Sequence, residues 1–236
     1  MKDKLKQIIS QFKSLNVQRL ELLAKAPEGP LKQFLSVPFP DNKTEIADLD
    51  ILAVDFETTG LNAKSDKLLS VGYVPIEHGL IKLGKSEHEI IHSSGDLHKD
   101  NVVIHQITDN EKANGLALEL VVEKMLNALA GKVMLVHYAT IERTFLQQAC
   151  IELYGMAPIW PIIDTLALAK KRLDRSDTAY DPNQLRLINL RHSYGLPAHH
   201  EHNALNDAVA TGELFLAQMR HYPLGFNTLL KEFVSK

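Results

Sequence analysis

Residues 51–60 read ILAVDFETTG, an apolar run that ends in two carboxylates, Asp55 and Glu57. Residues two apart on a β-strand point to the same face, so a strand here projects both carboxylates together. Two ionised carboxylates at that spacing repel each other, and a cation beside them relieves the repulsion. Oxygen ligands favour a hard ion such as Mg²⁺ or Mn²⁺. The alternative interpretation is a solvated strand end that carries two unrelated acids.

Composition limits the class of protein. The chain has 236 residues, 45% of them hydrophobic, which is enough for one large α/β domain with an appendage. The formal net charge of -3 means that nucleic-acid binding would need a local basic face. The candidates for such a face are Lys170, Lys171, Arg172, Arg175 and Arg186, and a solvated helix face is the alternative for each of them.

The single cysteine, Cys150, excludes an internal disulfide and fits a reducing compartment. Its neighbours favour a helix, so we interpret it as a buried structural thiol rather than a nucleophile. The sequence shows no signal peptide and no stretch that is long and apolar enough to span a bilayer. We therefore expect a soluble cytoplasmic protein that does not act at a membrane.

The order of the predicted elements indicates the fold class. Strand patterns occupy residues 49–56, 67–76 and 80–91, and Asp164 is predicted to cap the helix that follows it. Helical patterns alternate with a short strand further along the chain, at 115–130, 132–139, 140–155 and 202–222. Early strands followed by alternating helix and strand predict a mixed α/β sheet flanked by helices.

The N-terminal part has a separate pattern. Apolar residues recur at helical spacing over 3–26 and predict an amphipathic helix, which PEGP at 27–30 ends. The stretch VPFPDNKTE at 37–45 has the composition of a linker. We therefore divide the chain into a helical extension and linker, 1–47, and a catalytic domain, 48–236. The apolar stripe of the extension must be covered by its own domain, which we favour, or by another chain.

Two later stretches carry further candidate groups. In HNALNDA, 202–208, His202 stands five residues before Asp207 at the start of a predicted helix. An acid there can complete a metal site, and a histidine of near-neutral pKa can accept a proton from water. A surface histidine is the alternative, and His199 and His200 stand nearby. In LVHYATIERTFL, 135–146, Glu142 lies early in a helix and is a candidate ligand or a surface acid.

These stretches resemble, in the same order, the three motifs of the DEDD exonuclease superfamily. The branch is the one with a catalytic histidine, which includes the proofreading epsilon subunit of bacterial DNA polymerase III and ribonuclease T. VDFETTGL and HNALNDAVAT match the first and third motifs, whereas VHYATIERTFL departs from the second. IDTLALAKK and IHQIT resemble shorter family segments, and the resemblance covers about residues 52–220.

The resemblance implies a ribonuclease H-like fold and hydrolysis of nucleic acid from its 3′ end, which releases nucleoside monophosphates. Asp55, Glu57 and Asp207 match carboxylates that hold two Mg²⁺ or Mn²⁺ ions, and such ion pairs activate water and stabilise the leaving oxygen. His202 matches the general base. Glu142 stands where the family has its fourth acid, normally aspartate.

The resemblance also implies residues that contact the substrate. Thr58, Thr59 and Gly60 can offer backbone N–H groups to the terminal nucleotide, since glycine allows close approach, and the resemblance implies that Leu61 wedges against terminal bases. The alternative is an ordinary turn with a core leucine. Tyr138 replaces an asparagine and Gln106 a glycine of the family pattern. The predicted substrate-binding residues are Thr58, Thr59, Gly60, Leu61, His105, His137 and Tyr138.

The leading hypothesis is a metal-dependent 3′–5′ exonuclease acting on single-stranded nucleic acid, with DNA favoured over RNA. A second hypothesis is a catalytically weakened relative that binds nucleic acid, because Glu142 and Tyr138 depart from the family pattern. A third is a polymerase-associated subunit, or a homodimer, whose N-terminal helix recruits the partner. This third role is compatible with nuclease activity.

Overall fold

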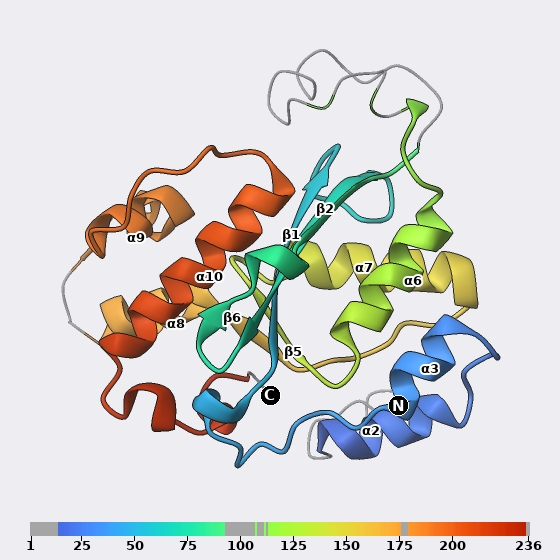
Figure 1. Cartoon of the computed structure of the whole chain (residues 1–236), viewed down its shortest axis with the longest axis horizontal. Helices are drawn as coiled ribbons and strands as arrows, with labels where there is room; N and C mark the ends of the chain where they lie inside the picture. Colours follow the sequence, from blue (N-terminus) through green and yellow to red (C-terminus); the bar gives the residue numbers. More distant parts are fainter. Residues whose placement is uncertain (1–13, 93–106, 108–110, 112, 176–178, 235–236) are drawn as a thin grey trace.

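A mixed β-sheet forms the centre of the molecule (Figure 1). The computed structural model describes residues 14–92, 107, 111, 113–175 and 179–234. The strand order is β3-β2-β1-β5-β6, and β4 also pairs with β2. The strands are β1 (Ile51–Thr58), β2 (Leu68–Glu77), β3 (Leu80–Ile81), β4 (Glu87–Ile90), β5 (Val133–Val136) and β6 (Ile162–Asp164). The central strand β1 runs antiparallel to β2 and parallel to β5, and β6 continues the sheet parallel to β5.

Helices cover both faces of this sheet. They are α2 (Leu15–Leu23), α3 (Pro30–Ser36), α6 (Leu118–Leu129), α7 (Thr140–Tyr154), α8 (Thr165–Asp174), α9 (Leu187–Ser193) and α10 (Ala204–Arg220). The alternation of β1 sends Leu52 and Val54 into a core shared with α6 and α7. Ile51 and Ala53 point the other way, into a core shared with Phe215 of α10. Because both faces are buried, β1 reads as a continuous apolar run until its carboxylates begin.

The start of α10 lies directly on the sheet. Gly72 of β2 pairs with Asp55 of β1, and a Cβ at Gly72 would stand 2.2 Å from the backbone of Ala204 and Leu205. Only glycine permits this approach, since any side chain there would displace the helix. The contact brings the first turns of α10 next to the C-terminal half of β1.

The N-terminal segment differs from the single helix and linker that we expected. Within the described residues, α2 ends at Leu23, and Pro30 begins a second helix, α3, instead of marking only a break. Proline suits the first helical position because its missing N–H has no partner there in any case. Phe34 of α3 and Phe39 of the expected linker are both buried in the core that α6 shares. Phe39 therefore anchors the stretch 37–45 to the core, although Val37 before it is exposed, and the stretch is no free linker there.

Most other predicted elements are confirmed, with shifted ends. The expected strand 80–91 divides into β3 and β4, joined by a 3₁₀ turn at Leu83–Lys85. Asp164 caps α8 as predicted, since its side chain accepts the N–H groups of Leu166 and Ala167. Cys150 is buried, and burial raises the pKa of its thiol to about 12. This environment agrees with the predicted structural thiol.

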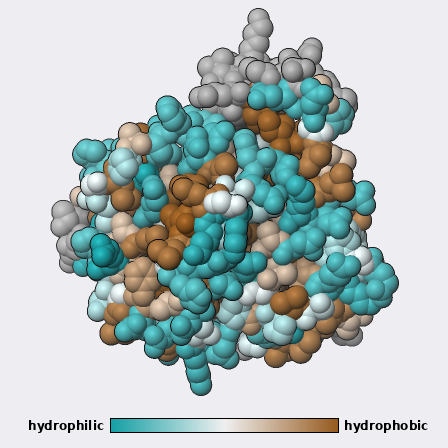
Figure 2. Space-filling view, viewed as in Figure 1, coloured by the Kyte–Doolittle hydropathy of each residue, from teal (hydrophilic) through white to brown (hydrophobic). Residues whose placement is uncertain are grey.

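The surface is mostly hydrophilic on the face shown in Figure 2, where apolar side chains gather near the middle, over α10. Across the described ranges, we find no helix that combines the length and the apolar character needed to cross a bilayer.

Candidate active site

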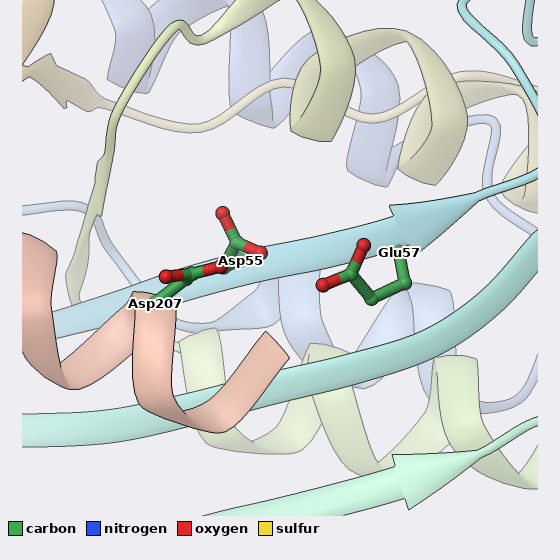
Figure 3. A group of neighbouring side chains, drawn as sticks. All are labelled: Asp55, Glu57 and Asp207. Carbon is green, nitrogen blue, oxygen red and sulfur yellow. The ribbon is translucent and has the colours of Figure 1, made fainter. Parts of the chain in front are cut away.

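Three carboxylates meet at the end of β1. Asp55, Glu57 and Asp207 each offer an oxygen, and these oxygens all lie within 4.8 Å of one another. Figure 3 shows the Asp207 carboxylate reaching from the start of α10 toward Asp55, with Glu57 further along β1. The first and third sequence motifs, about 150 residues apart in the chain, therefore contribute to one cluster, as their resemblance implied.

The electrostatics of Asp55 show that this cluster is strained without a counter-charge. The pKa of Asp55 is raised well above its ordinary value, first by burial and then by repulsion from Glu142, Asp207 and Glu57. All four causes act in the same direction and disfavour the ionised form. A divalent cation would reverse the balance, because it stabilises the ionised carboxylates that repel one another.

Glu142 belongs to the same electrostatic group. Its side chain, in the first turn of α7, is only 3% exposed, and its Oε2 has no hydrogen-bond partner among the described residues. Burial, followed by repulsion from Asp164 and Glu57, raises the pKa of Glu142 to about 8. A buried carboxyl oxygen without a partner is costly in a folded protein. Glu142 is thus no surface acid, and the all-oxygen donor set fits Mg²⁺ or Mn²⁺.

Asp207 is held by the turn that precedes α10. Its Oδ1 accepts a hydrogen bond from Nε2 of His199 at 2.9 Å, and its Oδ2 accepts the backbone N–H of His202 at 2.9 Å. Burial raises the pKa of Asp207, while His199 and the His202 N–H lower it. The side chain of His202 is exposed, and its backbone adopts φ +64°.

The second motif is organised around Asp164 and His137. Asp164 accepts the backbone N–H groups of Tyr138 and Ala139, both at 3.0 Å, in addition to capping α8. Tyr138 has φ +78°, and its side chain is 48% exposed. The His137 ring contacts the Thr165 hydroxyl at 2.8 Å and the Leu185 carbonyl at 3.0 Å, and burial lowers its pKa to about 4.

The remaining residues predicted to bind substrate differ in their exposure. Thr58 is buried and donates its hydroxyl to the Gly60 carbonyl at 2.7 Å, whereas Leu61 is 78% exposed. His105 and Gln106 lie outside the described residues. The five basic residues proposed for a backbone-binding face are all exposed, although Lys170 pairs with Asp174 and Arg172 stacks over Tyr194.

Sequence reasoning missed several residues that shape the site. Gly72 could have been found, because an isolated glycine in a strand often marks close backbone approach. His88 of β4 pairs with Gly72, so it lies two strands from Asp55, and its Nε2 is buried without a partner in the described chain. Arg191 is 2% exposed and binds α10. Nothing in the local sequence distinguishes this arginine from a surface one.

A family model, RNase_T, described as exonuclease, matches residues 52–215. The chain belongs to this exonuclease family. The matched segment runs from β1 into α10 and contains Asp55, Glu57, Glu142 and Asp207. The predicted family is therefore confirmed.

Relatives similar to the exonuclease domain include proteins named as DNA polymerase III of the PolC type and as its epsilon subunit. The chain is 31% identical over 169 residues to the PolC-type DNA polymerase III of Thermotoga maritima. The aligned residues make up 72% of this chain and 12% of the Thermotoga protein. It is 29% identical over 172 residues to the DNA polymerase III epsilon subunit of Treponema pallidum, and the aligned residues make up 72% of this chain and 76% of that subunit. The chain thus spans a small fraction of the PolC relatives and most of the epsilon subunit.

Solved structures confirm the ribonuclease H-like fold. The zinc-bound complex of E. coli exonuclease I with single-stranded DNA has a TM-score of 0.63 at 15% identity, covering 75% of this chain and 42% of that one. Exonuclease X in complex with 5′-overhanging duplex DNA has a TM-score of 0.56 at 19% identity, and the superposition covers 75% of this chain and 97% of exonuclease X. The exonuclease domain accordingly has the mixed α/β architecture that the order of its elements predicted.

Proposed function

We propose that this member of the exonuclease family is a metal-dependent 3′–5′ exonuclease that degrades single-stranded nucleic acid, with DNA preferred over RNA. The observation that carries the proposal is the group of four acids. Three of them converge within 4.8 Å, and the fourth, Glu142, is buried with an oxygen that lacks a partner in the described chain. A weakened, purely binding relative would have no need to keep four carboxylates in mutual repulsion.

The proposed cofactor is a pair of Mg²⁺ or Mn²⁺ ions held by Asp55, Glu57, Asp207 and Glu142. When bound, the ions would supply Lewis-acid activation of water and stabilise charge on the phosphate. The exposed imidazole of His202, next to Asp207 in the fold, would accept the proton of the attacking water. This assignment leaves the carboxylates free to act as ligands.

The terminal nucleotide would lie over the end of β1. In the turn after Thr58, the Thr59 N–H already donates to the Lys67 carbonyl at 2.9 Å, so the predicted contact would rest on the Gly60 N–H. Leu61, 78% exposed, is available to contact a base. Tyr138 of the second motif, which is half-exposed, offers an aromatic face, and aromatic side chains stack on bases of any sequence. Both ring nitrogens of His137 contact protein groups, so His137 would stabilise the chain that carries Tyr138 and would not bind the nucleotide itself.

The preference for DNA rests on relatives that are named as DNA polymerase III proteins and on a neighbour solved with single-stranded DNA. The same names support association with a polymerase. The N-terminal extension is one candidate surface, for a polymerase or for a second copy of this chain, because Val17 and Leu20 of α2 are 44% and 54% exposed. The molar mass of the full chain in solution, measured by light scattering, tests the homodimer.

The test of function uses 5′-labelled single-stranded DNA, single-stranded RNA and short oligonucleotides, each with Mg²⁺ and with Mn²⁺. We expect DNA to shorten stepwise from its 3′ end with release of nucleoside monophosphates. His202→Ala should lower the rate about 10²–10⁴-fold while Mn²⁺ binding stays near that of the wild type. His200→Ala, a neighbouring exposed histidine, is the control. Internal cleavage, or full activity in the presence of a chelator, would contradict the proposal.

A further inference from the structure

Both oxygens of Asp207 are occupied by one short turn of chain. Oδ1 accepts from the His199 ring and Oδ2 from the His202 backbone N–H. A carboxylate oxygen has more than one lone pair, so each can still bind an ion while it accepts these hydrogen bonds. The two contacts together fix the plane of the carboxylate that faces Asp55 and Glu57.

The His199 ring differs from the neighbouring histidines. Its side chain is 10% exposed, whereas His200 and His202 are both exposed. Because a carboxylate only accepts, Nε2 must carry the hydrogen that it shares with Asp207. Nδ1 is buried and has no hydrogen-bond partner in the part of the chain that the structure describes. Among the described residues, Asp207 is therefore the hydrogen-bond partner that orients the buried His199 ring.

A buried arginine anchors the other end of this turn. Arg191 donates to the Pro197 carbonyl at 2.9 Å and to the Ala210 carbonyl of α10 at 2.8 Å. It also pairs with Glu213 of α10 at 2.8 Å. Pro197 is two residues before His199, and Ala210 is three residues after Asp207. The segment that carries His199 is thus attached to α10 on both sides of the histidine.

We infer that His199 is a positioning residue, which orients the Asp207 carboxylate for the metal ions through its Nε2–H. This inference rests on the proposed function, in which Asp207 is a ligand. Hydrogen bonds from outer residues fix the orientation of metal ligands, and their removal typically weakens metal affinity 10–100-fold. His202, the residue proposed as the general base, donates its backbone N–H to the other oxygen of Asp207. An Asp207 carboxylate that His199 orients therefore also holds the backbone of His202 in place.

Two amide variants separate this role from simple packing. The side-chain nitrogen of glutamine reaches about as far as Nε2 of histidine, and that of asparagine only about as far as Nδ1. His199→Gln therefore keeps a donor within reach of Asp207, whereas His199→Asn removes it while leaving a polar side chain of similar kind. His200→Asn makes the same substitution at the exposed neighbour, whose side chain has no part in the proposed site.

The measurement is the Mn²⁺ dissociation constant by titration calorimetry on the full chain, with folding checked by circular dichroism and thermal melting. We expect His199→Asn to weaken Mn²⁺ binding 10–100-fold, and His199→Gln and His200→Asn to stay close to wild type. The turnover number should follow the same order. Rescue by glutamine supports the inference, since a loss of packing alone would affect both amide variants.

The inference is overturned if the folded His199→Asn protein binds Mn²⁺ as tightly as the wild type, or if both amide variants lose affinity equally. Tighter binding by His199→Asn would also overturn it, because the imidazole would then compete with the ion. Asp55→Asn tells this failure apart from failure of the proposed function. If Asp55→Asn leaves Mn²⁺ binding unchanged as well, the acids form no metal site.

Discussion

Two helices enter the site through similar turns. Tyr138 before α7 has φ +78°, and His202 before α10 has φ +64°. A left-handed backbone costs roughly 1–2 kcal/mol for a residue other than glycine, so each turn needs a compensating contact. In both turns an aspartate accepts the backbone N–H of the strained residue, Asp164 in the first and Asp207 in the second.

The two aspartates differ in what else they contact. Asp164 accepts backbone N–H groups from Tyr138, Ala139, Leu166 and Ala167. Asp207 accepts one backbone N–H and one imidazole N–H, and its oxygens lie beside those of Asp55 and Glu57. Three of these N–H groups converge on Oδ1 of Asp164, and Glu142, unlike Asp164, is among the acids whose repulsion raises the pKa of Asp55. This difference favours Glu142, and not Asp164, as the fourth ligand.

The largest effect expected is on the rate of hydrolysis when each aspartate is exchanged for asparagine. Asp207→Asn should lower the single-turnover rate by about 10²–10³-fold, because a neutral amide holds the ions that stabilise transition-state charge less tightly than a carboxylate does. Asp164→Asn should keep much of the rate but lose about 1 kcal/mol of stability, because one amide nitrogen then faces backbone N–H donors. Rate measurements and urea unfolding of both variants test this. A larger rate loss in Asp164→Asn would contradict our assignment.

Substitutions of Glu142 test whether it, and not Asp164, is the fourth metal ligand. If it is the fourth ligand, Glu142→Ala should lose metal affinity or activity by about 10–100-fold or more, and Glu142→Asp should retain activity. Mg²⁺ requires near-ideal octahedral geometry, so the longer glutamate arm should make the wild type prefer Mn²⁺. The assay compares the three proteins with each metal. If Glu142→Ala matches the wild type with both metals, Glu142 is no ligand.

The pH dependence of stability reports the same buried acid without any substrate. The pKa of Glu142 rises from its ordinary 4.5 to about 8, so the folded state binds this proton more tightly than the unfolded state does. Its contribution to stability is therefore complete below pH 4.5 and is lost as pH rises through about 8. Metal-free wild type should melt at lower temperature across this window, and added Mn²⁺ should reverse the loss. Glu142→Gln is the control, with a flatter profile.

The smallest expected effect concerns the strained residues themselves. Tyr138→Asn should stabilise the protein by up to about 1 kcal/mol, because asparagine enters the left-handed region more easily than tyrosine. His202→Asn should gain less, since histidine already tolerates this conformation better, and it should lose the proposed base. Denaturant unfolding of the two variants measures the difference. A destabilised Tyr138→Asn would show that the tyrosine ring contributes more than its backbone costs.

Much of the site could be predicted from local sequence. The i, i+2 spacing on β1 placed Asp55 and Glu57 together, and the third motif supplied Asp207 at the start of α10, where the structure has it. Asp164 was predicted as a helix cap, and the cap geometry confirms it. The boundary at residue 48 stays a prediction, and so does the role of His202. The packed segment through Phe39 was missed because its prolines suggested a linker.

The sequence by itself determined the family, most of the strands and helices (α3 and β6 are among the exceptions), and the residue types that can hold a divalent cation, because motifs and periodicity are local properties. Only the tertiary structure decided which groups meet. Gly72 lets α10 lie against the sheet, Arg191 ties the preceding turn to that helix, and His199 thereby reaches Asp207. Burial and mutual repulsion, which raise the pKa values of the acids, depend on distances that exist only after folding.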